Sequence, residues 1–241
     1  MTGRTRKTHA LKLCWGEPHA PLPLREISGP KRVVPWFDLD SRAGSLAPGP
    51  FNFCDHIQHL MHDIAARCPE FGHLQVPRIL VSVTQARGSA LHGLQARVTP
   101  LRFQGGALIR KRRGVLYGIQ RLFHLEHEYL YLMTFVLPRF LDQDFDRKLV
   151  TLFHEMHHIG PAFDGDLRRY AGRYAFHSHS RHAYDEHMAE LAREYLASRP
   201  DPRLFAFLRL NFSQLQARCG SVTGFVVPRP KIIPLVAPYV A

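Results

Sequence analysis

Residues 142–159, DQDFDRKLVTLFHEMHHI, decide the expected fold. Their leucine, phenylalanine, methionine and isoleucine side chains recur at spacings of three, one, three and three, which predicts an amphipathic helix. Asp142 or Asp144 can cap the start of this helix, and Asp146 adds negative charge in the first turn. The pair Gly160-Pro161 predicts its end.

The same helix carries the motif H-E-x-x-H at His154, Glu155 and His158. Residues four apart lie one turn above each other on a helix, so the two imidazoles can bind one zinc ion. Glu155 lies beside them, where its carboxylate can act as the general base on zinc-bound water. Random placement of the same residues would give this motif only about 0.04 times in such a chain, which favours a functional origin.

The length of 241 residues suits one domain with tails. We expect a basic, proline-rich arm at residues 1–30, the domain at 31–220 and an apolar, proline-rich tail at 221–241. No run of 18 apolar residues occurs, and the basic N-terminus lacks the apolar region of a signal peptide. Four scattered cysteines indicate reduced thiols. These features predict a cytoplasmic protein that does not enter a membrane.

The net charge is +12 and the isoelectric point is about 10.0, which favours acidic partners and nucleic acid first among them. The basic residues are spread along the chain except for one run, Arg110-Lys111-Arg112-Arg113. We expect this run at the end of a hairpin or on an exposed strand, where charge also opposes aggregation. Nucleic acid is therefore a candidate partner through this basic surface.

The order of elements predicts an α+β fold. An apolar stripe indicates a helix at residues 52–68, and β-rich segments at 78–84, 94–103, 107–120 and 128–137 indicate a small sheet of three or four mainly antiparallel strands. Two further helices are expected after the motif helix, at 181–198 and 202–218, the second capped by Asp201 and ended by Gly220. A short strand at 32–39 is also expected.

Residues 142–188 resemble a family of bacterial and phage zinc metallopeptidases with an HExxH motif and, more distantly, the SprT-like proteases. Both groups join such a helix to a later histidine near the start of another helix. The likeness rests on the segment from His154 to Asp185. It implies a zincin-like minimal metallopeptidase fold, a bound Zn2+ ion and the hydrolysis of peptide bonds in a peptide or protein substrate.

The third zinc ligand is left open between several side chains. The resemblance favours a histidine just before the helix at 181–198, where His179 is preferred over His177 because it adjoins the helix cap. A glutamate-type site would use Glu186 or Glu190 instead. The remaining candidates in this segment are His182 and Asp185, and Asp185 could instead orient a ligand from behind.

An oxyanion stabiliser is also expected. The candidates are Tyr170, Arg173, Tyr174 and Tyr184, and packing or surface roles explain each of them equally well. The segment Glu128–Leu137, if it forms the sheet edge nearest the motif helix, could pair with an extended peptide.

Two other functions remain open. Met156–Pro161 resembles the start of an HNH nuclease motif, and the basic charge suits DNA, although no Asn-x-x-His set follows. Alternatively, the protein could be a non-catalytic domain that is stabilised by a structural zinc ion and binds nucleic acid. Structural zinc sites usually contain cysteines, and none lies near His154 in the sequence.

Overall fold

The computed structural model describes residues 24–26, 46, 49–86, 92–124, 127–169 and 181–235. The strand expected at residues 32–39 lies outside these ranges, as do His177, His179 and Tyr174. Within the described ranges, none of the helices is long and apolar enough to cross a membrane.

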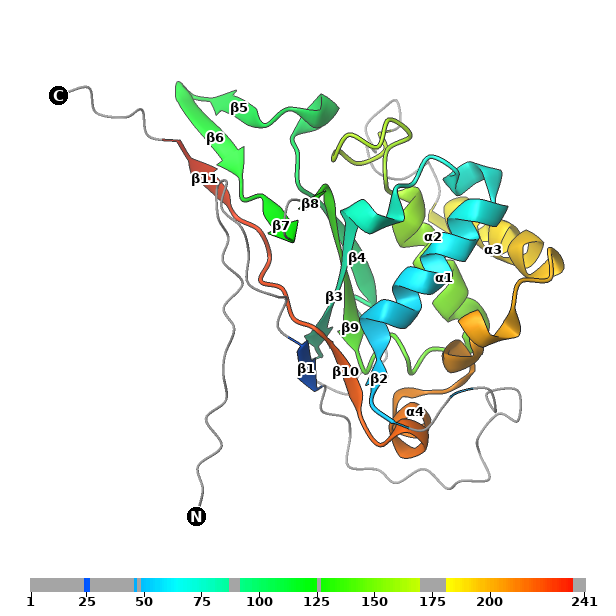
Figure 1. The fold of residues 1–241 in the computed structure, drawn as a ribbon. Coiled ribbons are helices and arrows are strands. Elements are labelled where there is room, and N and C mark those ends of the chain that lie inside the picture. The colour runs from blue at the N-terminus through cyan, green and yellow to red at the C-terminus, as the bar shows by residue number, and fades with distance from the viewer. Residues whose placement is uncertain are drawn as a thin grey trace, which may run out of the picture.

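The fold is α+β, as predicted, with four α-helices and several small sheets in the described part of the chain (Figure 1). The α-helices are α1 (Phe53–Arg67), α2 (Phe145–His157), α3 (Arg181–Ala197) and α4 (Phe212–Cys219). The one-turn 3-10 helices are η3 (Pro69–Phe71), η4 (Val76–Arg78), η5 (Gln104–Gly106), η6 (Pro202–Leu204) and η7 (Ala206–Arg209). The strands are β1 (Leu24–Glu26), β2 (Phe51–Asn52), β3 (Ile79–Gln85), β4 (Ala96–Pro100), β5 (Ile109–Arg112), β6 (Val115–Ile119), β7 (Leu122–His124), β8 (His127–Tyr129), β9 (Tyr131–Leu137), β10 (Val222–Phe225) and β11 (Ile232–Pro234).

A three-stranded sheet in the order β3-β9-β4 supports the helices. Strand β9 is its centre, parallel to β3 and antiparallel to β4, and all seven of its residues are buried. Buried residues on both faces are what a central strand requires. The segment 128–137 therefore does not provide the sheet edge considered from the sequence. Strand β4 provides it.

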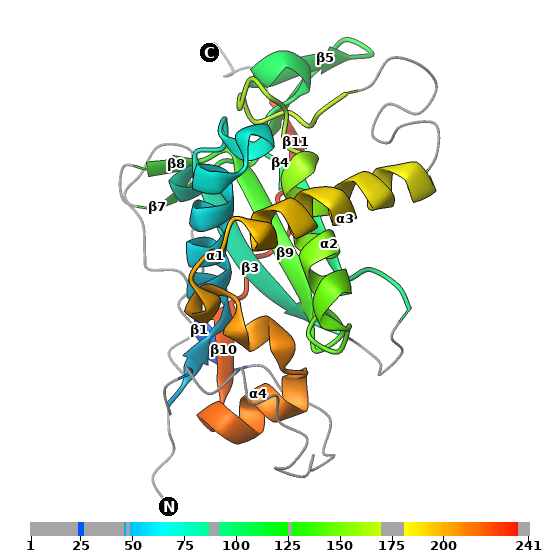
Figure 2. The same ribbon diagram turned by 90° about the vertical axis from the view of Figure 1, so that its right-hand side faces the viewer.

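Helices cover one face of this sheet (Figure 2). Side chains of alternating sheet positions, such as Ile79, Val81 and Met133, join the apolar stripes of the helices in one large core. The stripe predicted for the motif helix is confirmed, because Leu149, Leu152, Phe153, Met156 and Ile159 are all at most 1% exposed. Helix α3 adds Tyr184, Met188, Ala192 and Tyr195 to the same core.

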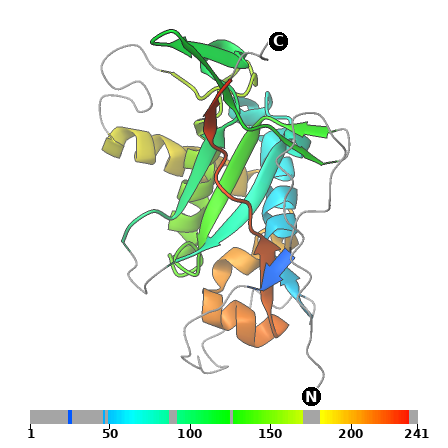
Figure 3. The same ribbon diagram turned by 90° about the vertical axis from the view of Figure 1, so that its left-hand side faces the viewer.

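The C-terminal segment crosses the other face of the sheet (Figure 3). Val227 joins Leu80 and Leu132 in a second, smaller core there. On either side of this crossing, β10 pairs with β1 and β2, and β11 pairs with β6. Residues from the expected arm and the expected tail thus pair with each other and with the body of the fold.

The β-rich segment predicted at residues 107–120 forms a hairpin, one of the two settings expected for its basic run, but it does not extend the central sheet. Strands β5 and β6 pair with β11 in a separate sheet. Gly105 and Gly106, with φ of 67° and 75°, turn the chain away from β4 before the hairpin begins. The single sheet expected from the sequence is therefore divided.

The fourth helix differs from the prediction. Residues 202–209 form η6 and η7, and only residues 212–219 form an α-helix. Asn211 starts α4 with a capping box, in which its side chain accepts from Gln214 N–H and the Gln214 side chain accepts from Asn211 N–H. The predicted cap Asp201 serves η6 instead, and Gly220 ends α4 as predicted, with φ of 79°.

The start of α2 settles the choice between the two predicted caps. Asp144 accepts from Arg147 N–H at 2.8 Å and is the N-cap. The Asp142 carboxylate accepts from Phe212 N–H at 3.1 Å instead, at the first residue of α4. Asp144 therefore caps α2, whereas Asp142 binds the first residue of α4.

Lys148 fixes the segment before α4 from within the core. Its side chain is 2% exposed, and its Nζ donates to the carbonyl oxygens of Leu208 at 2.9 Å and Leu210 at 2.8 Å. Burial lowers the pKa of Lys148 to about 8. The two carbonyls satisfy the ammonium group, and this bond holds the chain in the break between η7 and α4.

The depressed pKa of Lys148 predicts a pH-dependent stability. Between about pH 8 and pH 10.5 the unfolded chain binds a proton at this side chain that the folded chain does not, so raising the pH favours folding. Across that window, the wild-type protein should gain up to roughly 3 kcal/mol of unfolding free energy relative to Lys148→Met. Urea unfolding of both proteins at several pH values measures this, and parallel pH profiles would contradict it.

Candidate metal and catalytic site

His154 and His158 lie together at the C-terminal end of α2. Their ring centroids are 4.7 Å apart, and both side chains are partly buried. His158 is the C-cap residue, so the helix ends two residues before the predicted Gly160. The helical spacing thus brings the two imidazoles to one place, where a single cation could contact both.

Asp185 holds His154 from α3. Its Oδ1 lies 3.1 Å from Nδ1 of His154. Because a carboxylate only accepts, this contact assigns the proton to Nδ1 and makes Nε2 the nitrogen of His154 that would bind a cation. A carboxylate behind a histidine ligand is the usual arrangement in zinc proteins, where it fixes the ring and increases its basicity.

Glu155 is buried between α2 and the edge strand β4. It is 9% exposed, and its Oε2 accepts from Val98 N–H at 2.7 Å. Burial raises the pKa of Glu155 to about 7, against the opposing effects of the Val98 hydrogen bond and the charge of Arg97. A cation bound beside it would lower this pKa again. Such a carboxyl group can exchange protons near neutral pH.

His157 lies inside the motif but was not among the predicted site residues. This residue is 4% exposed, with Nδ1 at 2.7 Å from the Tyr184 hydroxyl and Nε2 at 3.1 Å from Oε1 of Glu70. Arg168 pairs with the same Glu70 at 3.0 Å. Burial lowers the pKa of His157 to about 3, helped by the charge of Arg168, so the ring is neutral. His157 therefore joins α2 to α3 and to η3.

These contacts fix the proton of Tyr184. The Glu70 carboxylate accepts, so His157 carries its proton on Nε2 and accepts on Nδ1. The Tyr184 hydroxyl must then donate to His157. Its ring stacks near His158, at a centroid distance of 5.9 Å, and edge-on to His154 at 4.8 Å. The Tyr184 ring thus packs against both His154 and His158. Its hydroxyl proton is used in the bond to His157 and so is not available to stabilise an oxyanion.

The loop after His158 is fixed by β9. The Tyr131 hydroxyl donates to the carbonyl oxygen of Asp166 and accepts from Gly165 N–H, both at 2.9 Å. Gly165 has φ of 91°, and a Cβ there would lie 2.4 Å from Cγ of Arg102, so only glycine fits. The loop at residues 163–166 is therefore rigidly attached to the sheet.

The described side chains do not add a third candidate ligand to His154 and His158. No group of three or more His, Cys, Asp and Glu residues there is arranged to hold a metal ion. Glu186 and Glu190 are both exposed on α3, and the exposed Glu186 pairs with the exposed His182 at 3.3 Å. Neither glutamate completes a set with His154 and His158. The preferred candidates His179 and His177, and the candidates Tyr170, Arg173 and Tyr174, lie outside the described ranges.

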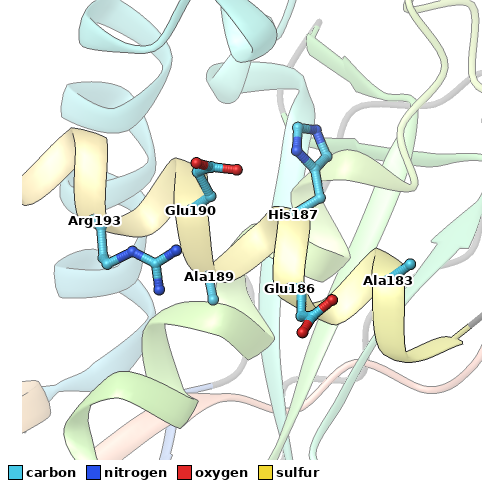
Figure 4. A pocket seen from close by; sticks show the side chains of 6 residues that line it. All are labelled: Ala183, Glu186, His187, Ala189, Glu190 and Arg193. Carbon is cyan, nitrogen blue, oxygen red and sulfur yellow. The ribbon is translucent and has the colours of Figure 1, made fainter.

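Figure 4 shows a hollow on α3. The lining side chains all belong to this one helix, namely Ala183, Glu186, His187, Ala189, Glu190 and Arg193. None of His154, Glu155 and His158 lines it. A surface formed by a single helix lacks the converging groups of an active site, so the motif end of α2 remains the candidate.

Comparisons with known proteins identify no relative. No protein-family model matches the chain, and neither the curated proteins nor the solved structures contain a significant match. Function must therefore be argued from the residues and their geometry.

The direction of the Tyr184 hydrogen bond predicts the effect of removing it. Tyr184→Phe leaves Nδ1 of the buried His157 without its donor, so the free energy of unfolding should fall by about 1–3 kcal/mol. The control is Tyr117→Phe, because the half-buried Tyr117 has no side-chain hydrogen bond among the described residues. Chemical denaturation measures both variants, and equal losses would show that the bond to His157 contributes nothing.

Proposed function

We propose that the protein is a zinc-dependent metallopeptidase of zincin-like architecture that hydrolyses peptide bonds. The observation that carries the proposal is the arrangement at the end of α2: two histidines side by side, one of them held at Nδ1 by Asp185, next to a buried glutamate. The succession of helix, small sheet, motif helix and further helix supports it.

The residues present fit a zinc ion. His154 through Nε2 and His158 supply two nitrogen ligands, and His179, or alternatively His177, supplies the third. A bound zinc ion would polarise the scissile carbonyl and make water more acidic. Three protein ligands leave one position open, as a catalytic site requires.

Glu155 acts as the general base and then as the general acid. Its carboxylate takes a proton from the attacking water and transfers it to the amine nitrogen as the peptide bond breaks. The Val98 hydrogen bond holds one carboxylate oxygen, Oε2, so that the other can face the water. Burial favours the neutral form and thereby makes the carboxylate a stronger base.

The outer edge of β4 pairs with no other described strand, and it is the proposed binding surface for the substrate, apart from Val98 N–H, which already donates to Glu155. Leu101 N–H donates to the carbonyl oxygen of Leu130, and Val136 N–H donates to the carbonyl oxygen of Gln95. The backbone N–H and C=O groups at odd-numbered positions of β4 therefore point toward β9. Even-numbered positions therefore face outward, among them Val98 beside Glu155. An extended peptide that pairs with this edge would lie next to the general base.

Neither alternative is supported by an observation of its own. The HNH reading requires the histidines on a strand and loop, whereas His154 and His157 lie within a helix. A structural zinc site would need a fourth ligand, usually cysteine. Cys54, Cys68 and Cys219 are buried in the large core, and the described residues form no such metal-binding group.

Metal content tests the ligand set. The purified protein should contain about one zinc per chain. Asp185→Asn should weaken zinc binding by about 10- to 100-fold in competition with a chelator, because the carboxylate orients His154. His179→Ala should weaken binding more than His177→Ala, and the exposed Glu186→Ala serves as control. No zinc after gentle purification, or loss of zinc only in Glu186→Ala or Glu190→Ala, would overturn this ligand set.

Glu155→Gln separates catalysis from binding. The amide oxygen can still accept from Val98 N–H, so zinc content should stay unchanged. Without the base, hydrolysis of fluorescently labelled casein should fall by at least about 10² to 10⁴-fold. The matched control Glu190→Gln, at an exposed position of α3, should keep full activity. Undiminished cleavage by Glu155→Gln would remove this residue from the mechanism.

A further inference from the structure

Strands β5 and β6 form a hairpin that projects from the body of the molecule (Figure 1). Its two-residue turn consists of Arg113 and Gly114, with φ of 49° and 82°, the left-handed pair typical of tight hairpins. Strand β11 pairs with β6 from Tyr117 to Ile119, and Leu235 N–H donates to the Leu116 carbonyl oxygen at 2.8 Å, so no described residue pairs with β6 beyond Leu116. The tip is therefore a two-stranded ribbon in the described structure, and we call residues 109–119 the basic ribbon.

The charge of the basic ribbon is uncompensated. Arg110, Lys111, Arg112 and Arg113 are all exposed, and none forms an ion pair with a described residue. The sequence contains no Asp or Glu from residue 71 to residue 125, nor from residue 202 to the end, so all three strands of this sheet come from acid-free segments. The ribbon therefore presents a concentrated positive surface.

Two carboxylates that adjoin this sheet are already paired with other arginines. Glu128 lies at the base of the sheet, where it contacts Arg102 at 2.6 Å and Arg121. Asp166 accepts from Gly105 N–H of η5, just before the ribbon, and pairs with Arg169 at 2.9 Å. The cations at the tip are thus left for an external partner.

Apolar side chains lie opposite the cations across the two strands of the hairpin. Of the six large hydrophobic side chains that are exposed in the described part of the chain, five belong to this sheet or adjoin it. They are Leu108, Ile109, Val115, Leu116 and Ile232. In the register of the hairpin, Lys111 lies opposite Leu116 and Arg112 opposite Val115. Since cross-strand partners share a face, each face of the tip combines a cation with an aliphatic group.

We propose that the basic ribbon binds double-stranded DNA. Two paired strands are about 5 Å apart, and the B-form major groove, about 12 Å wide, admits such a ribbon. The four cations would contact phosphates on the groove walls, and the aliphatic side chains would pack on sugars and thymine methyl groups. The deep, narrow major groove of RNA duplexes excludes a ribbon.

The composition of the tip argues against two other partners. Single-stranded nucleic acid is bound by aromatic stacking platforms, and the large exposed hydrophobic residues here are all aliphatic. A membrane-inserting hairpin needs one apolar face or an apolar tip, because burying charges in lipid is costly. This turn carries Arg113, and both faces contain cations. The mixed faces fit an aqueous groove lined with phosphates.

Fluorescence anisotropy with the full chain tests the proposal. The probe is a labelled DNA duplex of about 20 base pairs, roughly two helical turns, titrated at several salt concentrations. The test variant replaces Arg110, Lys111, Arg112 and Arg113 by Gln. The matched control replaces four exposed arginines elsewhere by Gln, namely Arg147, Arg193, Arg199 and Arg203. Both variants lower the net charge from +12 to +8.

The wild type should bind the duplex with an affinity that falls steeply as salt rises, because phosphate contacts release counterions. The ribbon variant should lose at least about 10-fold in affinity and reduce the salt slope by roughly 3, whereas the control should lose much less. A further variant with Lys at Arg110, Arg112 and Arg113 should keep most of the binding. Circular dichroism verifies folding of each variant.

Three results would overturn the proposal. These are no duplex binding by the wild type at low salt, equal losses in the ribbon and control variants, and preferential binding of the wild type to vesicles containing phosphatidylserine. Zinc content and casein cleavage are measured in parallel. The ribbon variant should retain both, so failure of DNA binding and failure of the peptidase proposal are separate outcomes.

Discussion

The hydrogen bond from Val98 N–H to the Glu155 carboxylate joins the motif helix to the edge of the sheet, and the geometry of the site depends on it. A buried carboxylate without a donor would be costly, so this contact determines how α2 lies against β4. Once α2 is set, its opposite side presents His154 and His157 to α3. Glu155 and the histidines are thus positioned by one helix that contacts both β4 and α3.

The polar groups around this helix form a shell that resists rearrangement. His157 connects Glu70 and Tyr184, and Tyr131 fixes the loop that follows His158. Each of these groups is buried or partly buried and satisfied, so a shift of one would leave its neighbours unpaired. Residues outside the candidate site can therefore determine how accurately Glu155, His154 and His158 are placed.

Local signals in the sequence predicted the elements that depend on neighbouring residues. Helices α1, α2 and α3 follow from the periodicity of apolar residues. Capping chemistry narrowed the start of α2 to Asp142 or Asp144, and the basic run at 110–113 was expected at a hairpin end or on an exposed strand, where β5 and its turn now place it. The sequence could not show which strands meet, because β11 reaches β6 from the far end of the chain. It also gave no reason to prefer His157 to its neighbours, since the partners Glu70 and Tyr184 are distant in sequence.

The pairing of β11 with β6 has a consequence for biosynthesis. Ile119 pairs with Ile232, which is synthesised 113 residues later. The hairpin therefore leaves the ribosome long before its third strand is available. A two-stranded hairpin is only marginally stable alone, and its aliphatic side chains would be open to association with other nascent chains. The arginines and the lysine along its edge oppose that association by mutual repulsion, and so act as gatekeepers during synthesis.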